Sequence, residues 1–151
     1  MSSTQILIEN KKARLEFFIL ESFEAGLKLT GSEVKMLRTK RGSLVGAHIR
    51  VLNGEAILLN AQIMAYPFAR QEDYDPKQTR TLLLHKREIL KIQQAQETKG
   101  LAIIPLAIIL KHNFIKLQLA IARGKKQYER REELRRRDLQ RESERELKGK
   151  R

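Results

Sequence analysis

The first part of the chain alternates short apolar runs with polar residues. Glu16–Glu21 and Leu27–Leu29 combine Phe, Ile and spaced Leu, which favours strands with one buried face. Phe23–Gly26 lies between them and is expected to form a turn. Thr30–Glu33 has the S/T-x-x-E spacing of a capping box, so the pattern predicts a short helix that runs to about Lys40.

The middle of the chain predicts a hairpin and then a surface loop. Asn53–Gly54 separates the apolar runs Ala47–Leu52 and Glu55–Ile63, and this pair is a strong hairpin signal because both residues tolerate a positive φ. Tyr66–Arg80 has two prolines, mixed charges and no apolar period, which indicates a loop. Loops of this length are uncommon unless they serve a function.

The following apolar runs predict a buried segment, a helix and a second hairpin. Leu82–Leu84 is expected to be buried, and Lys86–Thr98 has the spacing of a helix with one apolar side. Leu101–Leu110 and Phe114–Ala122 are β-branched runs on either side of a short polar turn. Pro105 inside the first run indicates an edge strand or a bulge.

This order of elements predicts a mainly β protein. We expect a small closed or half-closed β-barrel with short helices over its openings. Large apolar residues become rare after Gly124, too few to offset the entropy of ordering the remaining segment. We therefore expect two parts, a β-barrel domain at residues 1–123 and a basic C-terminal tail at residues 124–151.

Charge points to the kind of partner. The 151 residues include 31 Lys and Arg against 18 Asp and Glu, a net charge of +13 that favours a polyanion. Nucleic acid is the leading candidate and an anionic membrane the rival, although no apolar stretch is long enough to span a bilayer and the start of the chain is not a signal peptide. The chain has no Cys, which fits a cytoplasmic protein.

The tail is rich in strong helix formers and places acidic residues four positions ahead of basic ones. We expect the tail to be disordered in the free protein and helical when it is bound. A basic stripe along that helix would fit an RNA groove, with a merely solubilising tail as the alternative. The stripe consists of Arg130, Arg137, Arg141, Arg145 and Lys148.

No nucleophile and base, paired acids, phosphate loop or metal-ligand cluster of defined spacing is found, so we expect neither catalysis nor a cofactor. The candidate chemistry is instead a set of basic clusters beside turns and helix ends, where side chains can contact phosphates. An ordinary solvated surface is the alternative for each. The clusters are Lys11, Lys12 and Arg14; Lys35, Arg38, Lys40 and Arg41; Lys86 and Arg87; and Arg123, Lys125 and Lys126.

Two polar residues beside apolar runs are candidates for contacts with bases. Glu24 can accept hydrogen bonds from base amino groups while repelling phosphates, or it can be a solvated acid in a turn. His85 follows three leucines and can stack on a base or donate to it, or it can be a helix-start histidine satisfied by the backbone.

Five blocks in order resemble the SsrA-binding protein family, also called small protein B, which partners transfer-messenger RNA in the rescue of stalled bacterial ribosomes. The likeness covers nearly the whole chain. Gln78 and Thr81 depart from it, because basic residues are usual there. The blocks are Asn10–Arg14, Phe23–Arg38, Asp75–Pro76, Leu82–Ile89 and Ala122–Glu132.

The resemblance implies an oligonucleotide-binding-type barrel that is the RNA-binding domain of a monomeric, non-enzymatic adaptor. It implies that Asn10, Glu24, Leu83 and His85 help to bind the tRNA-like part of the RNA. It also implies that Tyr128 stacks in the decoding centre, beside small-subunit ribosomal RNA, while the tail folds along the empty messenger channel. Glu129, Arg130 and Arg131 would lie next to Tyr128.

Two other functions remain open at this stage. The chain could be a constitutive ribosomal or chaperone-like RNA-binding protein, with the barrel as its structural part and the tail as an anchor. An RNA-processing enzyme would need acidic metal ligands, which the sequence does not offer in a recognisable pattern.

Overall fold

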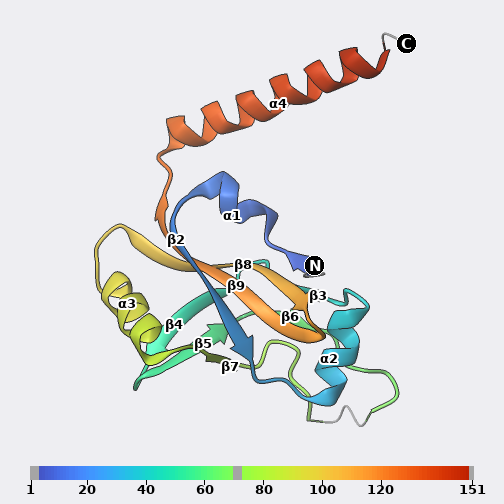
Figure 1. The fold of residues 1–151 in the computed structure, drawn as a ribbon, viewed down its shortest axis with the longest axis vertical. Coiled ribbons are helices and arrows are strands. Elements are labelled where there is room, and N and C mark those ends of the chain that lie inside the picture. Colours follow the sequence, from blue (N-terminus) through green and yellow to red (C-terminus); the bar gives the residue numbers. More distant parts are fainter. Residues whose placement is uncertain (1–3, 70–72, 150–151) are drawn as a thin grey trace.

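A computed structural model describes residues 4–69 and 73–149. Figure 1 shows a curved sheet with α2 and α3 at opposite ends and a long C-terminal helix beside α1. The elements are β1 (Thr4–Glu9), α1 (Lys11–Glu16), β2 (Phe17–Leu27), α2 (Gly31–Arg38), β3 (Gly42–Ser43), β4 (His48–Leu52), β5 (Glu55–Leu59), β6 (Gln62–Ile63), β7 (Arg80–Leu83), α3 (Lys86–Gln96), β8 (Leu101–Lys111), β9 (Phe114–Gly124) and α4 (Gln127–Gly149).

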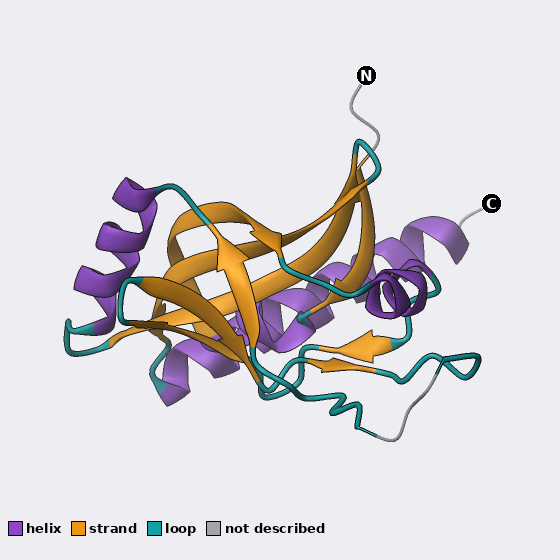
Figure 2. Cartoon of the chain, turned by 90° about the horizontal axis from the view of Figure 1, so that it is seen from below, coloured by secondary structure: helices purple, strands orange, loops and turns teal. Residues whose placement is uncertain are grey.

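Seven strands form one antiparallel sheet in the order β1-β8-β9-β2-β7-β5-β4. The mainly β class with short helices is confirmed, but the sheet is not closed. Its edge strands β1 and β4 do not pair, and the short β3–β6 pair beside β1 forms a separate two-stranded sheet instead of bridging the gap. Figure 2 shows the strong curvature that brings the open sheet close to a barrel in shape.

The turn predicted at Phe23–Gly26 is wrong, because β2 runs without a break from Phe17 to Leu27. A bulge between Ile19 and Glu21 shifts the strand's register on β9, so the inward residues before and after it are out of phase. The predicted break instead reflects the weak strand propensity of Glu, Ala and Gly in this segment, which the pairing of β2 with β9 and β7 overrides. The strand also ends at Leu27, before most of the second strand that the sequence predicted.

The first helix that the sequence predicted is α2, and it begins as predicted. The Thr30 hydroxyl accepts a hydrogen bond from the Glu33 amide at 3.2 Å, and the Glu33 carboxylate accepts one from the Thr30 amide at 3.0 Å. This reciprocal capping box satisfies two amides that a helix start leaves without backbone partners. The helix ends at Arg38, two residues earlier than expected, and Lys40 takes a positive φ of 61°.

Both predicted hairpins are present. Asn53 and Gly54 have φ values of 52° and 78°, which is the geometry that the Asn-Gly pair favours. β4 pairs with β5, although the second run breaks at Asn60. The bulge at Pro105 is confirmed, whereas the edge-strand alternative is wrong because β8 lies between β1 and β9.

The sequence reasoning missed the two N-terminal elements. β1 pairs with β8, and α1 packs over the outer face of the sheet, where Ala13 is buried against Ala120 and Ala122. A larger core fills the inner side of the curved sheet and includes Leu37, Leu117 and Leu119. The small residues on the outer face allow α1 to approach closely, which fixes the position of its basic residues.

The loop after β6 is present, but Arg80 belongs to β7 rather than to the loop. In the segment Leu82–Leu84, Leu82 is buried and Leu83 is exposed, because successive strand residues point to opposite faces. Leu84 follows the end of β7 and is half-buried against the core. α3 ends at Gln96, two residues earlier than predicted.

The segment expected to become helical is the helix α4, which lies beside α1 (Figure 1). Its disorder away from a ribosome stays a prediction, as does the division into a domain and a tail. Within residues 4–69 and 73–149, no helix combines the length and the apolar character needed to cross a membrane.

Candidate RNA-binding surface

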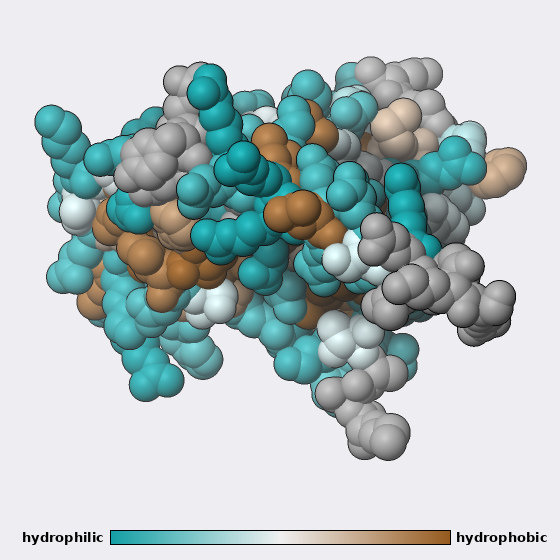
Figure 3. Space-filling model, turned by 90° about the horizontal axis from the view of Figure 1, so that it is seen from above, coloured by the Kyte–Doolittle hydropathy of each residue, from teal (hydrophilic) through white to brown (hydrophobic). Residues whose placement is uncertain are grey.

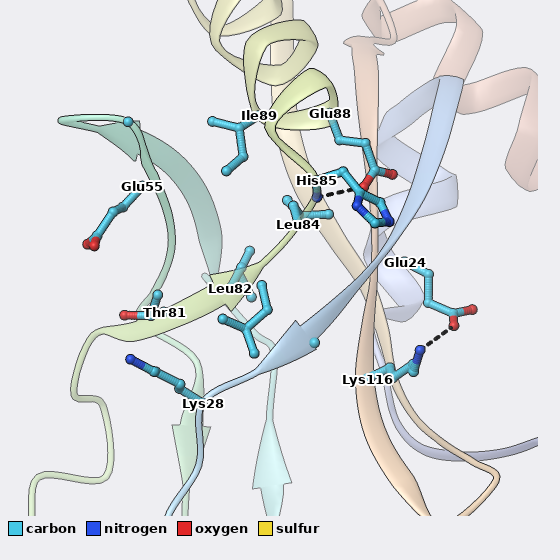
Figure 4. Close-up of a pocket in the computed structure, with 13 residues that line it drawn as sticks. Glu24, Lys28, Glu55, Thr81, Leu82, Leu84, His85, Glu88, Ile89 and Lys116 are labelled. Carbon is cyan, nitrogen blue, oxygen red and sulfur yellow. Dashed lines mark hydrogen bonds and ion pairs between the residues drawn. The ribbon is translucent and has the colours of Figure 1, made fainter.

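A groove of about 520 Å³ opens where β2, β7 and β9 meet the start of α3. We call it the main groove. Three of the predicted site residues, Glu24, Leu83 and His85, come together here from sequence positions up to 61 apart. Figure 4 shows Glu24 and Lys116 on one side of this groove, with His85 and Glu88 at its upper rim. The lining also includes Gly26 and Lys28.

The floor of the main groove presents an apolar side chain to solvent. Leu83 is 54% exposed, whereas its neighbour Leu82 is 3% exposed and belongs to the core. Gly26 pairs with Leu83 across the β2–β7 ladder, and a Cβ atom on Gly26 would lie 3.2 Å from the Leu83 Cβ. The glycine therefore leaves room for Leu83, whose exposed face can pack against a ribose or an unstacked base.

Glu24 does not lie in a turn, so the alternative of a solvated turn acid is wrong. It lies in β2 opposite Gln118, and its carboxylate oxygens lie 3.3 Å from Lys111 Nζ and 3.4 Å from Lys116 Nζ. These partly exposed pairs contribute little stability, but they orient the carboxylate. Each oxygen keeps a lone pair for a base amino group, while the two lysines offer their charge to neighbouring phosphates.

His85 occupies the N-cap of α3. The Glu88 carboxylate accepts a hydrogen bond from the His85 amide at 3.0 Å. The imidazole itself is exposed. His85 therefore occupies the helix-start position that the structural alternative expected, and its exposed ring also lies where a ligand in the groove can reach it. Lys86 and Arg87 are exposed in the first turn beside it.

A second groove of about 360 Å³, the side groove, lies between α1, the outer face of the sheet and α4. Asn10 contributes to it in part as a structural residue, because its Nδ2 donates to the Pro105 carbonyl at 2.8 Å and so ties α1 to the bulge of β8. A smaller hollow lined by Arg14, Glu24 and Gln118 connects the two grooves. The side groove is lined by Asn10, Lys11, Arg14, Gln118, Arg137 and Arg141, among others.

Arg123 and Lys125 lie together at the point where the chain leaves the sheet. The guanidinium carbon of Arg123 lies 4.7 Å from the centre of the Phe18 ring, and Lys125 Nζ lies 4.9 Å from it. Lys125 Nζ also donates to the Arg14 carbonyl at 2.9 Å, and its amide donates to the Glu16 carbonyl at 2.8 Å. The Phe18 contacts therefore fix the direction in which the tail departs.

The remaining predicted residues are more dispersed. Lys12 and Lys126 are exposed but line neither groove. Arg131 and Arg145 are exposed on α4. The side chains of Tyr128, Glu129 and Arg130 lie outside the described residues.

The sequence reasoning overlooked Lys116, Gln118 and Phe18. Lys116 and Gln118 alternate with the fully buried Leu117 and Leu119, and this period of two places them on one face of β9. That alternation could have identified them. Seen from the side uppermost in Figure 1, hydrophilic side chains cover most of the surface and hydrophobic ones gather in patches between them (Figure 3). Such a mixed surface suits a ligand with charged and flat apolar parts.

An open, curved antiparallel sheet that bears cations, hydrogen-bonding groups and exposed apolar side chains along connected grooves defines a small RNA-binding protein of the oligonucleotide-binding type. The sequence model of the SmpB protein family matches residues 7–149. The chain belongs to this family.

Individual relatives agree with this assignment. The SsrA-binding protein of Pelotomaculum thermopropionicum is 47% identical over 146 residues, which cover 97% of this chain and 95% of that protein. The SsrA-binding protein of Lactobacillus gasseri is 42% identical over 137 residues, 91% of each chain. A solved chain from the work described as "tmRNA-SmpB: a journey to the center of the bacterial ribosome" has a TM-score of 0.67 and 37% identity, covering 85% of this chain and 94% of that one.

Proposed function

We propose that this protein is a cytoplasmic, non-enzymatic adaptor of ribosome rescue. It binds the tRNA-like domain of transfer-messenger RNA and delivers this RNA to stalled ribosomes for trans-translation. The observation that carries the proposal is the convergence of Glu24, Leu83 and His85 in the main groove of a chain that belongs to the SmpB family.

The main groove supplies three kinds of contact with a folded RNA. Lys116 in the groove and Lys111, which pairs with Glu24, offer charge to phosphates. Leu83 offers an apolar face to an exposed base, and Glu24 and His85 offer hydrogen bonds to base edges. Single-stranded loops expose the base edges that such groups read, whereas a helical stem hides them. We therefore assign a loop of the tRNA-like domain to this groove.

The side groove extends the surface with positive charge. Lys11 and Arg14 on α1 lie on the same outer face as Gln118, and the connecting hollow joins them to Glu24. The RNA backbone next to the bound loop would run along the side groove and the connecting hollow. Arg123, Lys125 and Lys126 continue the basic surface to the start of the tail. Because the two grooves draw most of their lining from residues 1–123, we assign the main RNA-binding role to that domain.

The tail at residues 124–151 serves the ribosome. Tyr128 stacks in the decoding centre of the small subunit, next to Glu129, Arg130 and Arg131, while Arg137, Arg141 and Arg145 follow the phosphates of the empty messenger channel. The helical form of α4 supports this role, because a helix can present a continuous basic stripe to an RNA groove.

The test is a gel-shift series with a tRNA-like acceptor and elbow RNA at matched salt. Glu24→Ala should lower the affinity about tenfold, whereas Glu21→Ala is the matched control, an exposed acid on the same strand that pairs with Lys91. Equal effects of the two substitutions, or equal affinity for a random hairpin, would contradict the assignment. Ribosome profiles separate the alternative, because a constitutive ribosomal component co-sediments at one copy per subunit and an adaptor does not.

A further inference from the structure

An exposed aromatic pair lies beside α2, away from both grooves. Phe68 is 86% exposed, and its ring lies edge-on to the Tyr66 ring with 5.4 Å between their centres. Lys35 Nζ lies 5.0 Å from the centre of the Tyr66 ring. A phenylalanine this exposed loses the stabilisation that burial would give it, so a ligand that covers the ring would gain that free energy.

Further basic residues lie near Lys35 on α2 and just after this helix. Lys35 and Arg38 are one turn apart on α2 and both are exposed. Arg41 follows the helix, and its carbonyl accepts a hydrogen bond from the Met64 amide at 3.0 Å, which holds this basic segment against the start of the aromatic loop. We call Lys35, Arg38, Arg41, Tyr66 and Phe68 together the α2 patch.

Hydrogen bonds to the strands β6 and β7 hold the loop that carries the aromatic pair. The Tyr74 hydroxyl donates to the Ile63 carbonyl at 2.9 Å, and Arg80 donates to the Pro76 carbonyl at 3.0 Å. Burial, followed by the nearby Glu33 carboxylate, raises the pKa of the Tyr74 phenol, so Tyr74 remains a neutral donor at neutral pH. These bonds hold the later part of the loop, and at its start the Ala69 amide donates to the Tyr66 carbonyl at 3.1 Å. The turn that carries Phe68 is therefore ordered before binding, which lowers the entropic cost of binding there.

We propose that the α2 patch is a second RNA-binding site that takes unpaired nucleotides, with a base stacked on Phe68 and its phosphates beside Lys35, Arg38 and Arg41. Exposed aromatic rings next to cations are the arrangement by which proteins bind single strands without reading their sequence. The net charge of +13 favours a polyanion over an acidic or neutral peptide segment. The biological role of the α2 patch rests on the proposed function, but its binding of unpaired nucleotides does not.

The α2 patch is separate from the proposed tRNA-like site. The hollow beside Tyr66 shares no lining residue with either groove. α2 also lies at the opposite end of the sheet from α3, at whose start the main groove opens (Figure 1). One protein molecule could therefore hold a folded RNA in the main groove and an unpaired segment at the α2 patch.

The first experiment measures binding of a short fluorescein-labelled oligouridylate to the full chain by fluorescence anisotropy. Phe68→Leu keeps an apolar side chain but removes the ring, and it should weaken binding at least about fivefold. Phe68→Trp should retain binding, and its fluorescence should be quenched by the oligonucleotide, because the natural chain has no Trp to obscure the signal. Val45→Ala is the control, another apolar residue that is 72% exposed.

Substitutions distinguish RNA binding at the α2 patch from RNA binding in the main groove. Phe68→Leu should leave binding of the tRNA-like RNA within about twofold of the natural chain, and Glu24→Ala should leave oligouridylate binding equally unchanged. Lys35→Gln should reduce the salt dependence of oligouridylate binding by about 0.7 of a log unit per log unit of salt. Unchanged binding by Phe68→Leu, no quenching of Phe68→Trp, or self-association that depends on Phe68 would overturn the proposal.

Discussion

Arg80 and Glu33 form a buried ion pair, with 2.7 Å between Arg80 Nη2 and Glu33 Oε2 and only 2% of each side chain exposed. The same guanidinium donates to the carbonyls of Ala61 and Pro76 at 2.7 and 3.0 Å. The same carboxylate caps α2 through the Thr30 amide. One ion pair therefore connects the helix, the start of β7 and the loop between β6 and β7.

Removing one partner of this pair should be costly. Arg80→Met would leave the Glu33 carboxylate buried without its cation, and we expect the free energy of unfolding to fall by about 3–5 kcal/mol. Chemical denaturation followed by circular dichroism measures this loss. Arg50→Met, at an exposed position of β4, is the matched control and should cost well under 1 kcal/mol. Similar losses for the two variants would refute the structural role of the pair.

The same pair makes stability depend on pH. Burial raises the pKa of the Glu33 carboxyl, but the Thr30 amide and the Arg80 guanidinium outweigh it, and the net pKa lies below the ordinary value of 4.5. The contribution to stability is therefore complete above that ordinary pKa and is lost as the pH falls through the lower folded-state value. Denaturation at a series of acidic pH values should show this loss, and Glu33→Gln should flatten it. A curve of the same slope for Glu33→Gln would contradict the assignment to Glu33.

Gly26 controls the floor of the main groove. Gly26→Ala places a Cβ 3.2 Å from the Leu83 Cβ, and Leu83 can yield because half of it is exposed. We expect a modest loss of stability, about 1 kcal/mol, together with a clear loss of affinity for the tRNA-like RNA. Gel shifts and denaturation measure the two effects. Gly31→Ala, where no atom of the described residues lies within 4 Å of the added Cβ, is the control and should retain the affinity.

Phe18 should contribute to holding the start of the tail. Phe18→Leu removes the ring that Arg123 and Lys125 contact, and cation–π pairs at exposed sites contribute about 0.5–1 kcal/mol each. We expect stability to fall by about 1–2 kcal/mol by denaturation, with Phe18→Tyr close to the natural chain. If Phe18→Tyr, which keeps the aromatic ring, lost as much as Phe18→Leu, the contacts of the ring with the two cations would not explain the loss.

The tail and the domain should separate functionally. Deleting residues 128–151 should leave most of the affinity for free tRNA-like RNA and abolish peptide tagging on stalled ribosomes. A small loss of affinity is expected, because Arg137 and Arg141 line the side groove. The double variant Arg137→Gln, Arg141→Gln should reproduce that small loss in gel shifts. Equal loss of RNA binding and of tagging on deletion would contradict the division into two parts.

Elements that depend on neighbouring residues were predicted well. The Asn53–Gly54 hairpin and the Thr30–Glu33 capping box follow from bonds within four residues, and both are present. The long strand β2 was divided wrongly, because Glu24, Ala25 and Gly26 have weak strand propensity and are held in the strand by pairing with the distant strands β9 and β7. β1 and α1 were missed, because what holds them is β8 and the outer face of the sheet.

The candidate site was found from the sequence only in part. Glu24, Leu83 and His85 were singled out, and the fold brings them into one groove. The environment of Glu24 could not be derived, because Lys111 is 87 residues away along the chain and reaches it only because β9 pairs with both β2 and β8. Phe68 was not among the predicted site residues, because a sequence does not distinguish an exposed phenylalanine from a buried one.

The sequence by itself determined the charge, the two hairpins, the capped helix and the family pattern, because these depend on composition and on local backbone preferences. Only the tertiary structure decided that the sheet stays open, that Glu33 and Arg80 are paired across 47 residues, and which faces of the basic clusters point outward. The physical reason is that pairing and burial are set by the register of distant strands, which local preferences do not specify.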